Sequence, residues 1–387
     1  MLLLKNAELR TPAPAGRGDV LLAGGRILRV ETGIDIPARY CEVVDASGLL
    51  AVPGFIDGHV HMVGGGGEGG FATRTPELML SEAIRGGVTT VVGCLGTDGI
   101  TRTLGNLVAK ARGLEEEGLS TYVLTGHYEI PVVPLTGTIE GDLLFIDKVI
   151  GVGEVALSDH RSSQPSFEDF AALSGRARRG GILSGKAGIV NVHMGDGPRG
   201  LAFLRRMLEE TEIPATQFLP THCNRNPRLF EEATAYARNG GFVDFTTSTI
   251  PAFEAQGEVK CGAGLRRMLE AGVDSGHVTF TSDGQGSLPR FDEEGCICGA
   301  GVGRVSSLFE EVRRAVLHEQ VPLETALKVI TSNPAKLLKL RRKGRIAPGF
   351  DADLVLLDPA DLSIHTVIAG GRVFLRAGEV LVKGTFE

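Results

Sequence analysis

Residues 49–61 read LLAVPGFIDGHVH, an apolar run that ends in His59-Val60-His61, and four glycines follow at residues 64–67. In a β-strand alternate side chains point to the same side, so the two imidazoles would project together, with Cα atoms about 6–7 Å apart. A pair of histidines in this arrangement can bind a metal ion. The pair alone is weak evidence, because histidines that are solvated or satisfied in a core are common.

Three further candidate ligands occupy the same kind of position along the chain. His193, His222 and Asp283 each stand at the C-terminal end of a short apolar run. A (β/α) barrel places its catalytic residues at the C-terminal ends of its strands. The shared position therefore favours one site built from several strands over a chance scatter of polar residues.

The middle of the chain alternates β-branched runs with amphipathic segments, which is typical of repeated βα units. The expected strands cover residues 54–61, 88–95, 121–128, 150–158, 189–195, 217–223, 242–248 and 277–283. The expected helices cover residues 76–85, 104–117, 167–179, 201–210, 228–239 and 262–271, and two more at 302–319 and 323–340 would cover the barrel. We therefore expect an α/β fold with a (β/α)8 TIM-like barrel over residues 53–344.

The two ends of the chain have a different texture, with short alternating strands and no helical pattern. Residues 23–27 read AGGRI and residues 369–373 read AGGRV, an echo between the ends. Glycine pairs flanked by strands indicate hairpins. We expect residues 1–52 and 345–387 to build one small β-sandwich domain beside the barrel, the alternative being two unrelated hairpins.

Composition narrows the class of protein. The 387 residues carry 40 basic and 47 acidic side chains, a net charge of −7, and no basic cluster long enough to follow a phosphate backbone. Nucleic acid is therefore not expected as a partner. No apolar stretch reaches about 18 residues, so no membrane span is expected either.

The six cysteines show no spacing typical of a disulfide or zinc-finger framework, and we expect Cys296 and Cys298 to be thiols on a loop. The start of the chain lacks a basic leader followed by an apolar core. These features together predict a protein of the reducing cytoplasm.

A carboxylate lies inside the fourth expected strand. Alternation along this strand would put Val152, Glu154, Ala156 and Ser158 on one face, and if that face is inward Glu154 is a buried carboxylate. Such a group needs a cation, which a metal would supply. The alternative is an outward Glu154 paired with a lysine of the covering helices.

The candidate ligands number six, enough for two metal ions that share one carboxylate: His59, His61, Glu154, His193, His222 and Asp283. Nitrogen and oxygen donors without thiolate favour Zn2+, with manganese, iron or cobalt as alternatives. A hydroxide between the two ions would be the nucleophile, since zinc lowers the pKa of bound water from about 15.7 to about 7.

The order of these ligands and the sequence motifs around them resemble the amidohydrolase superfamily and, more narrowly, the isoaspartyl (β-aspartyl) dipeptidases. The matching words include PGFIDGHVH (53–61), GGGGE (64–68), GTD (96–98), SDHR (158–161), HMGD (193–196) and PTH (220–222). The family carries a carboxylated lysine as its metal bridge where this chain has Glu154. Glutamate is shorter by three bonds, about 3–4 Å of reach, and we predict that Glu154 bridges the two zinc ions in its place.

The resemblance also implies roles around the metals. Glu68 would contact the substrate α-amino group, Arg161, Arg225 and Ser287 would hold its carboxylates, Thr97 would be a further substrate contact, Tyr128 would stabilise the oxyanion, and Asp283 would act as general base and acid. Guanidinium groups suit this task because they grip carboxylates with two parallel hydrogen bonds. The implied substrates are small β-aspartyl dipeptides, and the implied assembly is a homo-oligomer such as an octamer.

Two alternatives stay open from the sequence. A cyclic-amide hydrolase of the hydantoinase or dihydroorotase kind shares the metal framework, although its substrates lack a free ammonium group for Glu68. A scaffold of the same superfamily without catalysis is the second alternative. The native metal, the filling of both sites, the leaving-residue preference and the oligomeric state are not encoded in any pattern.

Overall fold

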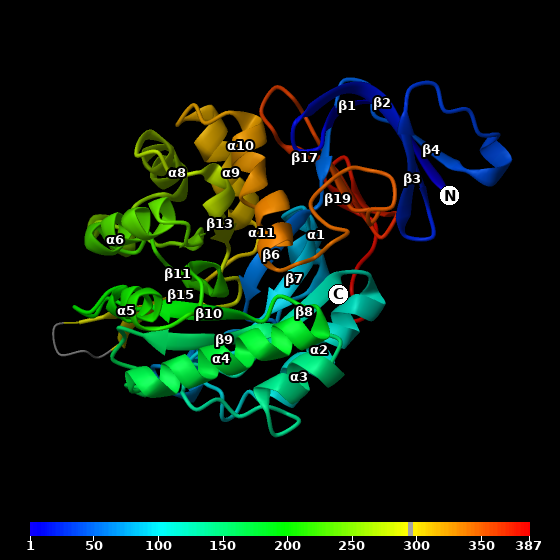
Figure 1. The fold of residues 1–387 in the computed structure, drawn as a ribbon. Coiled ribbons are helices and arrows are strands. Elements are labelled where there is room, and N and C mark those ends of the chain that lie inside the picture. Colours follow the sequence, from blue (N-terminus) through cyan, green and yellow to red (C-terminus); the bar gives the residue numbers. More distant parts are fainter. Residues whose placement is uncertain (293–296) are drawn as a thin grey trace.

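The structure, a computed structural model, describes residues 1–292 and 297–387, and its centre is a curled parallel sheet (Figure 1). The parallel strands are β6 (Phe55–Val60), β7 (Val88–Gly93), β8 (Ser120–Thr125), β9 (Val149–Leu157), β10 (Ile189–Met194), β11 (Phe218–Thr221), β12 (Val243–Thr246) and β13 (Val278–Thr281). Strands β6 to β11 pair in chain order, and β12 pairs with β13. Each coincides with a predicted run, with ends shifted by three residues at most.

Two contacts connect the six-stranded sheet, β6 to β11, with the pair of strands β12 and β13. The amide of Cys223, after β11, donates to the carbonyl of Asp244 in β12 at 3.1 Å. Val60 at the end of β6 forms a parallel bridge with Gly284, which follows β13. Strand β11 therefore lies beside β12, and the end of β13 lies beside the end of β6.

Helices cover the outer face of this sheet (Figure 1). They are α1 (Leu80–Arg85), α2 (Leu104–Glu117), α3 (Ile139–Phe145), α4 (Phe167–Ser184), α5 (Ala202–Glu210), α6 (Pro227–Arg238), α7 (Pro251–Ala255), α8 (Cys261–Glu270), α9 (Ser307–Leu317), α10 (Leu323–Lys328) and α11 (Ser332–Leu337). Short 3₁₀ turns are η1 (Ala38–Tyr40), η2 (Phe71–Thr73), η3 (Ala215–Gln217) and η4 (Ser275–His277). Within the described residues, no helix combines the length and the apolar character needed to cross a membrane.

Local sequence signals explain where the longer helices begin and end. The side chains of Thr103, Ser166 and Asn226 accept hydrogen bonds from the first turns of α2, α4 and α6. Such N-caps satisfy backbone amides that have no partner inside the helix. Gly118 and Gly185 end α2 and α4 in the left-handed conformation that glycine adopts most easily.

The predicted helix over residues 323–340 is wrong as a single element. The structure has α10 and α11 there, separated at residues 329–331. Pro334 explains the break, because proline lacks an amide proton and its ring would clash with the carbonyl four residues earlier in a continuous helix. In α11 it occupies the first turn, where the missing amide costs nothing.

A hairpin follows the last parallel strand where none was predicted. It consists of β14 (Ser287–Phe291) and β15 (Ile297–Val302), in antiparallel register. Cys298 therefore lies on an exposed strand and not on a loop, which corrects the prediction for that residue. Cys296 lies outside the described residues.

Both ends of the chain contribute to one separate sheet with the order β19-β18-β17-β16-β5-β1-β2-β3, and β4 pairs with β1. The strands are β1 (Leu2–Arg10), β2 (Pro14–Ala23), β3 (Arg26–Glu31), β4 (Glu42–Asp45), β5 (Leu50–Pro53), β16 (Leu354–Leu357), β17 (Ile364–Ala369), β18 (Arg372–Arg376) and β19 (Glu379–Val380). The two glycine turns of the echo meet here: the Ala352 amide donates to Gly25 at 2.9 Å, and the Ala352 carbonyl accepts from Gly371 at 2.8 Å. In Figure 1 the N-terminal strands of this sheet are blue and its C-terminal strands are red.

Candidate metal centre

The six candidate ligands come together at the C-terminal ends of the parallel strands, and all six are buried. They are His59 on β6, His61 just after it, Glu154 on β9, His193 on β10, His222 just after β11 and Asp283 just after β13. His222 and Asp283 adopt positive φ angles of 62° and 53°. This left-handed backbone is costly for residues with a side chain and is found preferentially at functional sites.

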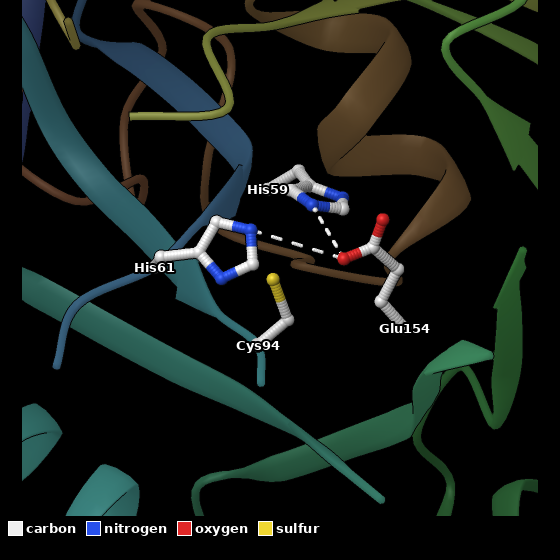
Figure 2. A group of neighbouring side chains, drawn as sticks. All are labelled: His59, His61, Cys94 and Glu154. Atoms are coloured by element: carbon white, nitrogen blue, oxygen red, sulfur yellow. Dashed lines mark ion pairs between the residues drawn. The ribbon is translucent and has the colours of Figure 1, made fainter. Parts of the chain in front are cut away.

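The Glu154 carboxylate lies at the centre of the four histidines. Its Oε1 is 2.7 Å from Nδ1 of His193 and 3.1 Å from Nε2 of His222. Its Oε2 is 3.3 Å from Nε2 of His59 and 3.8 Å from Nε2 of His61 (Figure 2). One oxygen faces each histidine pair, which is the arrangement that a carboxylate shared between two cations requires.

The inward direction of the Glu154 side chain depends on an irregularity in the pairing of β9, which strict alternation of side chains along a strand does not predict. The register of β9 against β10 shifts between Val152 and Val155. Val152 consequently packs with Val155 in the outer hydrophobic cluster, which includes Phe170 of α4. The expectation that Val152 and Glu154 share a face is therefore wrong, although Glu154 itself faces the histidines.

Several buried polar atoms of this cluster have no hydrogen-bond partner. Among the described residues they include both ring nitrogens of His59, Nδ1 of His61 and Oε2 of Glu154. Buried polar groups are nearly always paired, and leaving one unpaired costs about 1–3 kcal/mol. Imidazole nitrogens and carboxylate oxygens are ligands of divalent metal ions. The residues present therefore fit a bound metal, and no competing hydrogen bonds would have to break at these atoms.

Cys94 at the end of β7 belongs to the same cluster and was missed in the sequence, where only nitrogen and oxygen donors were expected. The possible ligand atoms fall into two overlapping groups, each with atoms within 4.8 Å of one another. One group is His59, His61, Cys94 and Glu154, and the other is Glu154, His193 and His222. Burial raises the pKa of the Cys94 thiol to about 11.

The electrostatics favour the metal-binding form at Glu154 and His222, but not at His59 and His193. Burial would lower the pKa of His59, but Cys94 and Glu154 outweigh burial and raise that pKa. Glu154 likewise outweighs burial and raises the pKa of His193, so these two rings would lose a proton on binding metal. Burial works to raise the pKa of Glu154, but His59 and His193 outweigh it and hold that pKa well below its usual range. Burial and the neighbouring His193 lower the pKa of His222 to about 3. An ionised carboxylate and a neutral imidazole are the states that coordinate a cation.

Outer partners fix the orientation of two histidines. Nδ1 of His222 lies 2.6 Å from Oγ1 of Thr246, which leaves its Nε2 facing Glu154. Nε2 of His193 lies 3.0 Å from Oδ2 of Asp159, which leaves its Nδ1 facing Glu154. Such partners set the tautomer and ring direction of metal-binding histidines.

Asp283 stands between the histidines and the substrate side of the site. Its Oδ1 is 3.1 Å from Nε2 of His61, and its Oδ2 is 3.8 Å from Nη2 of Arg225. Burial raises the pKa of Asp283, but the hydrogen bond and charge of His61 overcome this and lower it. Asp283 is therefore an ionised carboxylate that can accept a proton.

A cavity of about 430 Å³ opens next to these ligands. Three of the predicted substrate residues, Thr97, Arg161 and Ser287, contact a fourth, Glu68, in this cavity. Oε1 of Glu68 is 3.4 Å from Nη1 of Arg161 and accepts from Thr97 at 3.3 Å. The Ser287 hydroxyl donates to Oε2 of Glu68 at 3.0 Å. The predicted partner of an ammonium group and one predicted partner of a carboxylate thus face each other.

The two predicted carboxylate-binding arginines are each held by an acidic residue that the sequence did not single out. Asp159 binds Arg161 through two hydrogen bonds, at 3.0 Å to Nε and 2.8 Å to Nη2. Glu258 accepts from Nη1 of Arg225 at 3.1 Å. Arg225 also lies over the ring of Phe253, 4.9 Å from its centroid. Only Asp159 carried a usable signal, as a member of the SDHR word.

Tyr128 lies beside both the ligands and the arginines. Its hydroxyl is 2.8 Å from Nδ1 of His193, and the Arg161 guanidinium lies 5.3 Å from its ring centroid. Burial raises the pKa of Tyr128 well above its usual value. The hydroxyl therefore keeps its proton and is available as a hydrogen-bond donor.

Comparisons with known proteins found a family model, a sequence relative and a structure of similar fold. A family model described as the amidohydrolase family matches residues 258–374. The dihydroorotase of Leifsonia xyli subsp. xyli is 26% identical over 390 residues, which cover 90% of this chain and 85% of the relative. A D-hydantoinase structure is 18% identical with a TM-score of 0.66, covers 99% of this chain and 97% of its own, and supports the fold alone.

A closer likeness comes from two structures of β-aspartyl dipeptidase from the thermophilic, keratin-degrading Fervidobacterium islandicum AW-1. One, in complex with the dipeptide β-Asp-Leu, is 47% identical with a TM-score of 0.91 and covers 98% of each chain. The other is 45% identical with a TM-score of 0.89 and the same coverage. The chain belongs to the metal-dependent amidohydrolase family and, within it, to the β-aspartyl dipeptidases.

Proposed function

We propose that the protein hydrolyses the isopeptide bond of small β-aspartyl dipeptides at this centre. The observation that carries the proposal is the likeness, over 98% of both chains, to a β-aspartyl dipeptidase crystallised with β-Asp-Leu. The local geometry supports it, because Glu68, Arg161 and Arg225 offer one anionic and two cationic groups in a single cavity. A β-aspartyl dipeptide carries the matching ammonium group and carboxylates.

Two zinc ions are the proposed cofactor, held by the six candidate ligands with Glu154 as the shared one. The support is that each Glu154 oxygen faces a separate histidine pair. Metal ions bound there would supply Lewis-acid polarisation of the scissile carbonyl and activation of water. Glu154 makes this possible without the carbon dioxide that a carboxylated lysine needs.

Glu68 is proposed to receive the substrate ammonium group, while Arg161, Arg225 and Ser287 hold the carboxylates. Thr97 and Ser287 donate to Glu68 in the structure, so they also orient its carboxylate. Arg161 keeps Nη1 directed at Glu68 while Asp159 occupies Nε and Nη2. A bound substrate would replace the contact between Arg161 and Glu68, with its carboxylate on Arg161 and its ammonium group on Glu68.

Proton transfer is assigned to Asp283 and oxyanion stabilisation to Tyr128. Asp283 would take a proton from the attacking water at a carboxylate oxygen and return it to the leaving amine. The Tyr128 hydroxyl would donate to the substrate oxygen on which negative charge develops. Both groups line the same cavity, which is the support for pairing them in one reaction.

The finer architecture is also a proposal. We infer that the parallel strands close into a (β/α)8 barrel and that residues 1–52 and 345–387 form a β-sandwich domain beside it. The contacts of β11 with β12 and of β13 with β6 support closure. A homo-oligomer such as an octamer stays a prediction, which light scattering on the purified protein would check.

Steady-state hydrolysis of three substrates tests the function. We expect the zinc-loaded protein to cleave β-Asp-Leu, to leave α-Asp-Leu and dihydroorotate intact, and to lose activity when a chelator removes the metal. Turnover of dihydroorotate without cleavage of β-Asp-Leu would favour a cyclic-amide hydrolase. Metal-loaded protein that cleaves none of the three would favour a scaffold.

A further inference from the structure

Cys94 differs from the other described buried thiols in its surroundings. The sulfurs of Cys41, Cys223 and Cys261 donate to backbone carbonyls at 3.2–3.3 Å, whereas the distance from Cys94 to the Val60 carbonyl is 3.8 Å. Figure 2 shows the Cys94 sulfur directed toward the space between His61 and Glu154. The sulfur makes only a long contact with the Val60 carbonyl and faces a group of candidate ligands, among which His59 interacts with it directly.

The surrounding atoms are independent evidence of a group of metal-binding atoms on this side. His59 is fully buried, and its ring nitrogens and Oε2 of Glu154 make no hydrogen bond, although His59 Nε2 and Glu154 Oε2 lie 3.3 Å apart as an ion pair. The Cys94 sulfur and the ligand atoms of His59, His61 and Glu154 lie within 4.8 Å of one another. A single ion among them would give every one of these atoms a partner.

The position of Glu154 gives a reason for an additional ligand here. Its Oε1 lies 2.7 and 3.1 Å from His193 and His222, while its Oε2 lies 3.3 and 3.8 Å from His59 and His61. The carboxylate thus sits closer to the His193–His222 pair. On the His59–His61 side Glu154 is more distant, and the second carboxylate there is Asp283, with Oδ1 3.1 Å from Nε2 of His61 and 3.8 Å from Nε2 of His59.

We infer that Cys94 is a thiolate ligand of the metal ion held by His59 and His61, an assignment that rests on the metal centre of the proposed function. On binding, the S–H bond breaks, a metal–sulfur bond forms, and the proton passes to solvent. The thiolate adds a negative charge on the side where Glu154 is more distant. Sulfur is a soft donor, so this position favours zinc over manganese and magnesium.

Zinc X-ray absorption on protein loaded with stoichiometric zinc tests the inference. Zinc–sulfur distances are about 2.3 Å and zinc–nitrogen distances about 2.0–2.1 Å, so a sulfur shell is distinguishable. The measurement uses Cys298→Ser protein, because Cys298 lines the cavity and could hold stray zinc. We expect a sulfur shell in this background, its loss on adding Cys94→Ser, and its retention on adding Cys41→Ser, which removes a buried thiol of the terminal sheet.

A second readout is zinc affinity by competition with a chelator. Cys94→Ser is expected to weaken one zinc site by at least about tenfold, the lower end of losses seen even for outer partners of metal ligands. A sulfur-free spectrum from active, zinc-loaded protein would overturn the inference and leave the proposed function standing. Failure to bind zinc at all would overturn both. Because the parent spectrum is informative by itself, an unfolded Cys94→Ser variant would not prevent a decision.

Discussion

At the residue scale, Tyr128 is the group whose role depends most on charge that develops during the reaction. Tyr128→Phe should lower kcat about 10²–10³-fold and change KM little, because the lost hydrogen bond strengthens only in the transition state. Steady-state kinetics with β-Asp-Leu measure both constants. Tyr122→Phe is a matched control, since Tyr122 lies on β8, the strand that precedes Tyr128, but outside the cavity. A large rise in KM with kcat unchanged would contradict the assignment.

Asp283 is the residue proposed to act as general base and acid. Asp283→Asn keeps the size of the side chain but removes the proton acceptor, so turnover should fall about 10²–10⁴-fold. The variant should still fold, but the thermal unfolding midpoint of the metal-free protein should fall, because the lowered pKa of Asp283 shows that its ion pair with His61 stabilises the folded state at neutral pH. Activity near the parent level in this variant would remove Asp283 from the role of general base.

The candidate ligands that could be predicted from the sequence differ from Cys94, which was missed, in the kind of signal that they carry. His59, His193, His222 and Asp283 were singled out because strand ends of a barrel converge, which is a positional signal. Cys94 had the same position, at the end of the run over residues 88–95, but a cysteine was judged only by its spacing from other cysteines. Glu154 was singled out by alternation inside its strand, which predicted its inward direction although Val152 does not share its face.

Partners that depend on how loops fold back were beyond prediction from the sequence. Glu258 lies 33 residues beyond Arg225 along the chain, and nothing in the sequence connects the two. The contact of Asp159 with both Arg161 and His193 likewise arises only when β9 and β10 are adjacent. Side-chain geometry after a strand end is set by tertiary contacts.

At the scale of elements, the segment after β7 keeps His61 in place through a close approach. A Cβ built on Gly96 would lie 2.8 Å from Cε1 of His61, so Gly96→Ala must displace that ring. Zinc affinity should fall about 10–100-fold, as it does when the partners that orient metal ligands are removed. Gly113→Ala in α2 is the control, because no atom lies within 4 Å of its added methyl group and alanine favours helix. Unchanged zinc affinity in Gly96→Ala would show that His61 is not a ligand.

The same segment carries a charge whose pKa makes a testable pH dependence. Burial would raise the pKa of Asp98, but hydrogen bonds from Thr101 and the charge of Arg74 lower it to about 2. A lowered pKa stabilises the fold above the ordinary value of 3.8, and this contribution disappears as pH falls through about 2. Asp98→Asn should therefore destabilise the metal-free protein at neutral pH by about 1–2 kcal/mol, less than about 1.36 kcal/mol per pKa unit would give because Asp98 is partly exposed.

Urea unfolding of parent and Asp98→Asn protein across the acid range measures this difference. The gap should narrow between about pH 4 and pH 2, as the parent carboxylate takes up its proton. A gap that stays constant over that range would mean that the Asp98 charge makes no contribution. Histidines and other carboxylates titrate equally in both proteins and cancel in the comparison.

Elements were predictable where burial is continuous. The parallel strands read as unbroken apolar runs because they are covered on both faces, and their positions were confirmed. The hairpin of β14 and β15 was missed because its glycine, proline and charged residues carry no regular alternation. The irregular register of β9 was also beyond prediction, since pairing with the neighbouring strand sets it.

At the scale of the whole molecule, the metal should contribute to stability as well as to chemistry. Four histidines and two carboxylates from five strands converge at the centre, so an ion that binds only the folded state links these strands. At free zinc about 1,000-fold above Kd the gain is about 4 kcal/mol per site. Thermal unfolding with zinc, with chelator and with zinc restored should show a reversible drop in midpoint. An equal midpoint in all three samples would argue against ligands from several strands.

The most direct measurement of the central claim is anomalous X-ray diffraction at the zinc edge from crystals of the zinc-loaded protein. Glu154 should lie between two anomalous peaks, one beside His59 and His61 and the other beside His193 and His222. Glu154 turned outward among the helices, or no peak near these histidines in zinc-replete crystals, would contradict the claim that this glutamate bridges a metal centre.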